Sequence, residues 1–128
     1  MFTTDKAFSG FSVDDIDAAR TFYGETLGLE VSDNAMGFLE LHLASGAGIL
    51  IYSKPNHEPA GFTILNFPVA NIDEAVIDLN SRGVETKIYA DEDFPSDERG
   101  IVRGDGRGPD IAWFRDPAGN VLAVLQDD

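Results

Sequence analysis

FSVDDIDAARTFYGETLGLEV, residues 11–31, is the segment from which the fold is predicted, because its opening returns in the second half of the chain. A shift of 56 positions places Phe11–Ala19 (FSVDDIDAA) over Phe67–Ala75 (FPVANIDEA), and five positions are identical. LGLE at residues 27–30 then matches RGVE at residues 82–85 if one residue of length difference is allowed. Internal similarity of this kind indicates a duplicated supersecondary unit.

Each copy is predicted to pass from a strand into a helix. Alternating residues typical of a strand come before Asp14 and Asp15 in the first copy and before Asn71 in the second. Side chains of these types accept hydrogen bonds from the first amides of a helix. Apolar residues then recur at helical spacing until Gly28 and Gly83, and glycine is common just beyond helix ends. The apolar stripes are therefore predicted to form core.

Further strands are predicted after each helix, at residues 29–33, 38–43, 49–53, 84–89, 111–115 and 121–125. The connection over residues 91–109 is longer than a hairpin loop and contains a short predicted strand at residues 101–103. Its length makes it a candidate lid or pocket rim. The predicted fold class is α+β, with two tandem βαβββ modules.

Composition predicts one domain over residues 1–128, with module one at about 1–56 and module two at about 57–128. The 128 residues are 43% hydrophobic, which is enough to form an ordinary core. The absence of cysteine excludes disulfides, thiolate metal sites and cysteine nucleophiles. The chain shows no basic leader and no apolar run of membrane-spanning length. We therefore expect a cytoplasmic protein without a membrane partner.

The charge balance narrows the class of partner. A formal net charge of −14 repels the phosphate backbone of nucleic acids, so no nucleic-acid partner is expected. Neutral or cationic small molecules are favoured instead. The alternative is that the acidity serves only solubility.

The two modules, opened by the stretch quoted first and closed by WFRDPAGNVLAVLQ at residues 113–126, resemble the vicinal oxygen chelate superfamily. This superfamily includes glyoxalase I, dioxygenases and bleomycin-resistance proteins. The resemblance spans nearly the whole chain, and the combination of FYxxxLGxxV with DPxGN is its specific part. It implies a curved mixed sheet around a cleft, helices on the convex side, and a homodimer.

Metal-dependent members of that superfamily hold an ion with side chains of the first and last strands of each module. The resemblance places these positions at Phe8, Ile64 and Ala123, and a fourth at about Ile51. Hydrocarbon side chains supply no electron pair to a metal ion. We therefore expect no metal and no cofactor, and a pocket that binds a small organic molecule by burial and shape.

Other side chains are predicted to face the same cleft. Ser12, Asn66 and the strand pair of Glu40 and His42 offer hydrogen bonds, although His42 also fits a strand histidine without chemistry. Arg103 is a candidate for an anionic ligand group, and Trp113 for stacking or for core packing. The predicted ligand-binding residues are Phe8, Ser12, His42, Ile51, Ile64, Asn66, Arg103, Trp113 and Ala123.

The leading functional interpretation is a metal-independent small-molecule-binding protein of the glyoxalase/bleomycin-resistance type, with a cationic ligand favoured by the acidic balance. The alternative is an enzyme of the same superfamily, a lyase, isomerase or dioxygenase. Such an enzyme would use displaced metal ligands such as His42 and Glu40, or metal-free catalysis. No Ser–His–Asp order, nucleotide fingerprint or pair of catalytic carboxylates can be assembled, so no catalytic residue is assigned.

Overall fold

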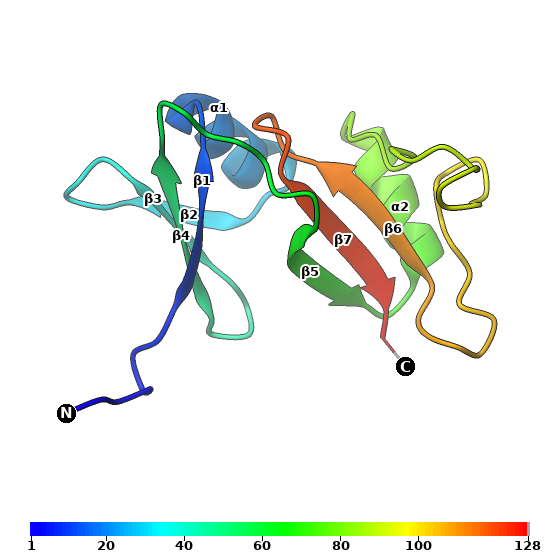
Figure 1. The fold of residues 1–128 in the computed structure, drawn as a ribbon, viewed down its shortest axis with the longest axis horizontal. Coiled ribbons are helices and arrows are strands. Elements are labelled where there is room, and N and C mark those ends of the chain that lie inside the picture. Colours follow the sequence, from blue (N-terminus) through cyan, green and yellow to red (C-terminus); the bar gives the residue numbers. More distant parts are fainter. Residues whose placement is uncertain (128) are drawn as a thin grey trace. The chain divides into compact units, whose positions relative to one another are not determined.

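The computed structural model describes residues 1–127. The chain divides into two compact units, Met1–Pro59 and Ala60–Asp128, and each has its own sheet and helical segment (Figure 1). The sheets contain four and three strands. The predicted α+β class is therefore confirmed, in an arrangement consistent with two modules of the βαβββ type. Among the described residues, no helix has the length and apolarity needed to cross a bilayer.

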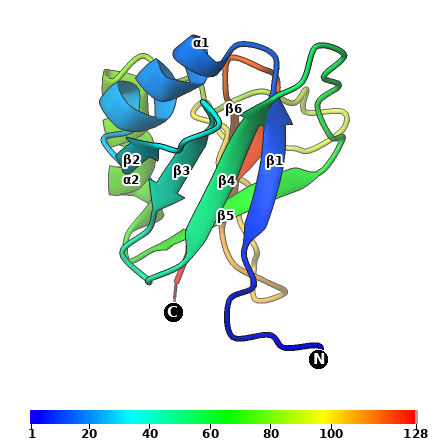
Figure 2. The same ribbon diagram turned by 90° about the vertical axis from the view of Figure 1, so that its left-hand side faces the viewer.

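The sheet of Met1–Pro59 brings the first and last strands of the module together (Figure 2). Its strands, in spatial order, are β1 (Ser9–Val13), β4 (Gly48–Ser53), β3 (Leu39–His42) and β2 (Glu30–Asp33). β1 and β4 are parallel, whereas the other neighbours are antiparallel. Parallel neighbours need a crossover rather than a hairpin, and the helical segment after β1 begins it.

The helical segment of this unit starts where the sequence predicts. Asp15 caps α1 (Ile16–Arg20) by accepting hydrogen bonds from the amides of Asp17 and Ala18, at 3.0 and 3.2 Å. The helix then widens into a π-helical segment, η1 (Thr21–Thr26).

Tyr23 of η1 identifies the covered face of the first sheet. It is fully buried, and its ring centroid lies 5.8 Å from that of Phe11 on β1. Strand alternation places the other buried sheet residues on the same face, and they are Val13, Leu39, Leu41 and Ile51. Each such side chain contributes about 1.5–3 kcal/mol by leaving water. The opposite face carries no helix of this unit.

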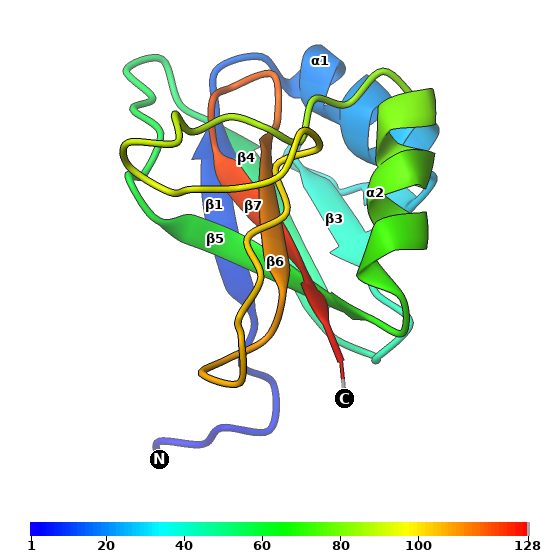
Figure 3. The same cartoon turned by 90° about the vertical axis from the view of Figure 1, so that its right-hand side faces the viewer.

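The unit Ala60–Asp128 repeats the plan with fewer strands (Figure 3). Its elements are β5 (Thr63–Val69), α2 (Ile72–Ser81), β6 (Ile111–Arg115) and β7 (Val121–Gln126), and the spatial order of the strands is β5-β7-β6. As predicted, Asn71 caps α2, and its side chain accepts a hydrogen bond from the amide of Glu74 at 3.1 Å.

Gln126 shows which face of the second sheet α2 covers. Its side-chain oxygen accepts a hydrogen bond from the amide of Ile72 at 2.9 Å, and its side-chain nitrogen donates to the carbonyl of Ala70. Leu122 and Val124 alternate with Gln126 on the same face of β7. Trp113, Ala123 and Asn66 consequently belong to the opposite face, because their Cα positions pair across β6, β7 and β5.

The strand predicted at residues 84–89 does not form. Thr86 is buried, but its hydroxyl donates to the carbonyl of Arg99 at 2.6 Å and accepts from the side chain of Asn80 at 2.9 Å. The edge of β6 is instead bonded by Val102, which exchanges backbone hydrogen bonds of 2.8 and 3.0 Å with Ile111. This bridge is also all that forms of the strand predicted at residues 101–103.

Candidate functional site

The helix-free face of the first sheet carries a hollow with a volume of about 320 Å³. Strand register places Gly10, Leu50 and Glu40 side by side across β1, β4 and β3 on this face. Phe8 and Met36 border the hollow and remain 70% and 69% exposed. The residues that line it are Phe8, Asn34, Met36, Glu40, Leu41, His42, Gly48, Ile49 and Leu50. Apolar side chains thus meet a few polar groups, as in small-molecule sites.

Two histidine–serine hydrogen bonds belong to this unit. Nε2 of His42 lies 2.7 Å from the hydroxyl of Ser32 on the neighbouring strand. Nδ1 of His57 lies 2.6 Å from the hydroxyl of Ser12, which ties the segment after β4 to β1. Of the predicted polar residues, Ser12 and His42 therefore have side-chain partners inside the unit.

The orientation expected for Ile51 is wrong. Ile51 is fully buried and pairs with Phe11 and Leu39, so it lies on the face covered by the helical segment. Its neighbours Leu50 and Tyr52 have the opposite orientation. A one-residue uncertainty in alignment is enough to exchange the two faces of a strand.

Three of the predicted residues form one row on the helix-free face of the second sheet. Ala123 of β7 pairs with Asn66 of β5 on one side and with Trp113 of β6 on the other. The indole N–H of Trp113 donates to the hydroxyl of Thr63 at 3.1 Å, which fixes the ring orientation. Ala123 is fully buried, Trp113 is half-buried and Asn66 is exposed.

Ile64 lies at an irregularity of β5. The register shifts between Thr63 and Leu65, which pair with the consecutive residues Val121 and Leu122. Two residues of β5 therefore advance against one of β7, as in a β-bulge. Simple alternation from Asn66 consequently does not assign a face to Ile64.

Arg103 is occupied by the protein's own carboxylates. Its guanidinium lies 2.8 Å from Asp73, 3.0 Å from Asp110 and 3.5 Å from Asp97. These contacts tie the long connection to the first turn of α2 and to the start of β6. An anionic ligand would have to displace three aspartates, so the geometry supports a structural role for Arg103 rather than the predicted binding role.

This network makes stability depend on pH. The guanidinium of Arg103 lowers the pKa of Asp73, and the amide of Gly104 together with Arg103 lowers the pKa of Asp110. An aspartate with a lowered folded-state pKa stabilises the protein above its unfolded pKa, and this contribution is lost as pH falls through the folded pKa. We expect Arg103→Met to lower the melting temperature at pH 7, with a difference that shrinks below about pH 4.

The contribution is modest, because the guanidinium of Arg103 is 42% exposed and solvent screens the pairs. Arg107→Met is the matched control, since Arg107 lies in the same connection and forms no ion pair within residues 1–127. Thermal unfolding at pH 7 and pH 3 compares the two variants. Equal melting temperatures for both variants at pH 7 would contradict the assignment.

A metal centre does not fit the predicted ligand positions. Phe8, Ile64 and Ala123 carry no donor atoms in their side chains. Among residues 1–127, no three His, Asp or Glu side chains are grouped so that they could hold an ion. His42 and Glu40, considered above as displaced metal ligands, therefore have no third donor among residues 1–127 with which they could hold an ion.

Sequence reasoning missed Met36 and Leu50 at the hollow, and Phe94 beside Trp113. Alternation along β4 contained the signal for Leu50, once the face of one residue was known. Met36 lies in a turn, and Phe94 lies in the long connection, where no periodicity applies. For Phe94 the available signal was an aromatic residue within an acidic segment.

Comparison with protein families agrees with this architecture. The family model described as the Glyoxalase/Bleomycin resistance protein/Dioxygenase superfamily matches residues 9–124. The chain belongs to this superfamily. No curated protein sequence matches the chain at a significant level.

Solved structures share the fold. A glyoxalase family protein from Enterococcus faecalis is 24% identical, with a TM-score of 0.69 and coverage of 98% of this chain and 99% of that one. A superfamily member from Sphaerobacter thermophilus is 21% identical, with a TM-score of 0.70 and coverage of 98% and 100%. A lactoylglutathione lyase from Agrobacterium tumefaciens is 18% identical, with a TM-score of 0.66 and coverage of 95% and 93%. At these identities the similarity establishes the fold alone.

Proposed function

We propose that the protein binds a small organic molecule without a metal ion, in the hollow on the helix-free face of the first sheet. The observation that carries the proposal is the apolar side chain of Phe8 at a position where the superfamily resemblance implies a metal ligand. Phe8, Met36 and Leu50 instead border a hollow of about 320 Å³. Ligand sites commonly measure about 300–1,000 Å³ and combine apolar walls with a few polar groups.

The polar side of the hollow favours a ligand with a cationic group. Glu40 is exposed there and forms no ion pair within residues 1–127, and His42 lines the same hollow. A carboxylate beside apolar surface attracts an amine or another cation, and the net charge of −14 acts in the same direction. Glu40 and His42 thus orient the ligand, while Phe8, Met36 and Leu50 bury its apolar part.

Binding is tested by a thermal-shift screen of basic glycopeptides and aromatic metabolites. A ligand at about one hundred times its dissociation constant stabilises a protein by roughly 2.7 kcal/mol. We expect Phe8→Ala combined with Met36→Ala to remove most of the shift produced by a hit. Phe62→Ala should retain the shift, because Phe62 is also 70% exposed but does not line the hollow.

The control separates local from general effects, since all three residues are exposed and none supports the core. A hit whose shift survives in the double variant would place its site elsewhere. Elemental analysis of protein purified without chelator tests metal independence, and a stoichiometric transition metal would refute it.

Two accompanying proposals concern the setting of the protein. We expect a homodimer, as the superfamily resemblance implies, and size-exclusion chromatography with light scattering measures it. We also propose a cytoplasmic location, with which the absence of cysteine is compatible. Fractionation of the producing cells checks the location.

A further inference from the structure

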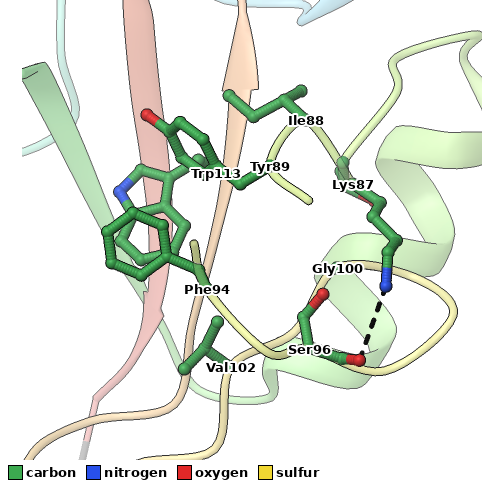
Figure 4. Close-up of a pocket in the computed structure, with 9 residues that line it drawn as sticks. Lys87, Ile88, Tyr89, Phe94, Ser96, Gly100, Val102 and Trp113 are labelled. Atoms are coloured by element: carbon green, nitrogen blue, oxygen red, sulfur yellow. Dashed lines mark hydrogen bonds between the residues drawn. The ribbon is translucent and has the colours of Figure 1, made fainter. Parts of the chain in front are cut away.

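Three aromatic side chains of the unit Ala60–Asp128 gather beside β6 (Figure 4). The ring centroids of Tyr89 and Phe94 lie 5.0 Å apart, those of Phe94 and Trp113 lie 5.1 Å apart, and those of Tyr89 and Trp113 lie 5.4 Å apart. Each pair is therefore in the range of favourable aromatic contact. The cluster is distinct from the hollow on the first sheet and involves none of its residues.

Two members of the cluster form a platform. Trp113 projects from β6, and its indole N–H is held by Thr63 of β5, so its orientation is fixed by two strands. Trp113 and Tyr89 are both half-buried, whereas Phe94 is 43% exposed. The solvent-facing member of the cluster is therefore Phe94.

Phe94 lies between two anchors provided by one side chain. The ammonium group of Lys87 donates to the carboxylate of Asp91 at 2.8 Å and to the carbonyl of Asp97 at 3.1 Å. It also approaches the carbonyl of Ser96 at 3.5 Å, the contact drawn in Figure 4. These bonds hold the segment on both sides of Phe94, and none of them involves its phenyl ring.

We infer that the place of the Phe94 ring is a binding seat for a planar aromatic cation, with Phe94 as its internal occupant. A phenyl ring already fills the position against Trp113 and Tyr89, which shows that the platform accepts a flat ring. A ligand ring takes the same position when Phe94 turns outward. The faces of Trp113 and Tyr89 attract cations as well as apolar surface.

The surrounding charges favour a cation over an anion. Glu92 and Asp93 stand directly before Phe94, are exposed, and form no ion pair within residues 1–127. The ammonium group of Lys87 is already met by the carboxylate of Asp91 and by carbonyl oxygens. The two carboxylates directly before Phe94 outnumber Arg115, the exposed cation two residues from Trp113 on the same face of β6, so the net charge beside the seat is negative.

Isothermal titration calorimetry with N-methylquinolinium, a planar aromatic cation, tests the inference. Phe94→Ala empties the seat and should tighten binding roughly two- to tenfold, because aromatic pairs of this kind contribute that much. Trp113→Leu removes the platform and should weaken binding at least about tenfold. Neutral quinoline should bind more weakly than the cation, and higher ionic strength should weaken the cation further.

Phe62→Ala is the matched control, because Phe62 is an exposed phenylalanine of the same unit outside the cluster. Trp113 is the only tryptophan of the chain, so its fluorescence reports the seat directly. In the free protein, Phe94→Ala should shift the emission to longer wavelength, and Phe62→Ala should not.

Several results would overturn the inference. They are weaker binding by the Phe94 variant, unchanged binding by the Trp113 variant, or no binding of the probe to either wild type or the Phe94 variant. Quinoline binding as tightly as its cation would equally refute the preference for charge. The hollow on the first sheet is tested with different variants, so either proposal can fail alone.

Discussion

Gly100→Ala is expected to destabilise the protein by about 3 kcal/mol or more. Gly100 has φ of +88°, a conformation that side-chain-bearing residues rarely adopt. A Cβ atom there would lie 2.0 Å from the carbonyl oxygen of Thr86 and 2.7 Å from Cα of Lys87. These neighbours are backbone atoms, so relief requires the connection to move away from residues 84–89.

That movement would disturb the hydrogen bonds that replace the missing strand. The hydroxyl of Thr86 bonds to the carbonyl of Arg99, the residue directly before Gly100. Lys87 follows Thr86 in the sequence and anchors the segment that carries Phe94. We therefore also expect the substitution to expose Trp113, with emission at longer wavelength.

Gly108→Ala provides the control within the same connection. Gly108 has no positive φ, and a Cβ atom there would meet nothing within 4 Å. Its effect should stay within about 0.5 kcal/mol. Urea unfolding followed by circular dichroism and by Trp113 fluorescence measures both variants. Equal stability of the Gly100 and Gly108 variants would show that Gly100 does not lie against the backbone of Thr86.

The elements predicted correctly are those whose signals are local. Asp15 and Asn71 cap helices because a short side-chain acceptor needs only the amides two or three residues ahead. Strands bounded by turn residues and marked by alternation formed within about one residue of their predicted limits. The internal repeat strengthened each assignment by offering the same pattern twice.

The incorrect predictions concern residues whose structure depends on a partner far away in the sequence. Residues 84–89 have a strand-like sequence, but the edge that they would have extended is bonded by Val102. The sequence predicts Arg103 as a ligand contact, because it does not show that Asp73, 30 residues away, lies beside it. Ile64 falls in a bulge, and one inserted residue removes the alternation on which its assignment rested.

Phe114→Ala is expected to lower the free energy of unfolding by about 3–5 kcal/mol. Phe114 is 1% exposed, and its ring is stacked on that of Phe67 with centroids 6.5 Å apart. It pairs with the fully buried Leu122 on the face that α2 covers. Removal of the ring leaves a cavity between the sheet and the helix. Phe62→Ala, an equal truncation at a site that is 70% exposed, should cost little.

Phe114 and Trp113 are adjacent on β6 but project from opposite faces, so this variant separates stability from binding. Phe114→Ala should leave the platform of Trp113 in place and keep the affinity for N-methylquinolinium within about twofold in the folded fraction. Since domains are stable by only about 5–15 kcal/mol, Phe114→Leu supplies a milder variant if the alanine protein does not fold. Affinity that falls in proportion to stability would mean that the two faces of β6 are not independent. A loss as small as that of Phe62→Ala would show that α2 does not cover Phe114.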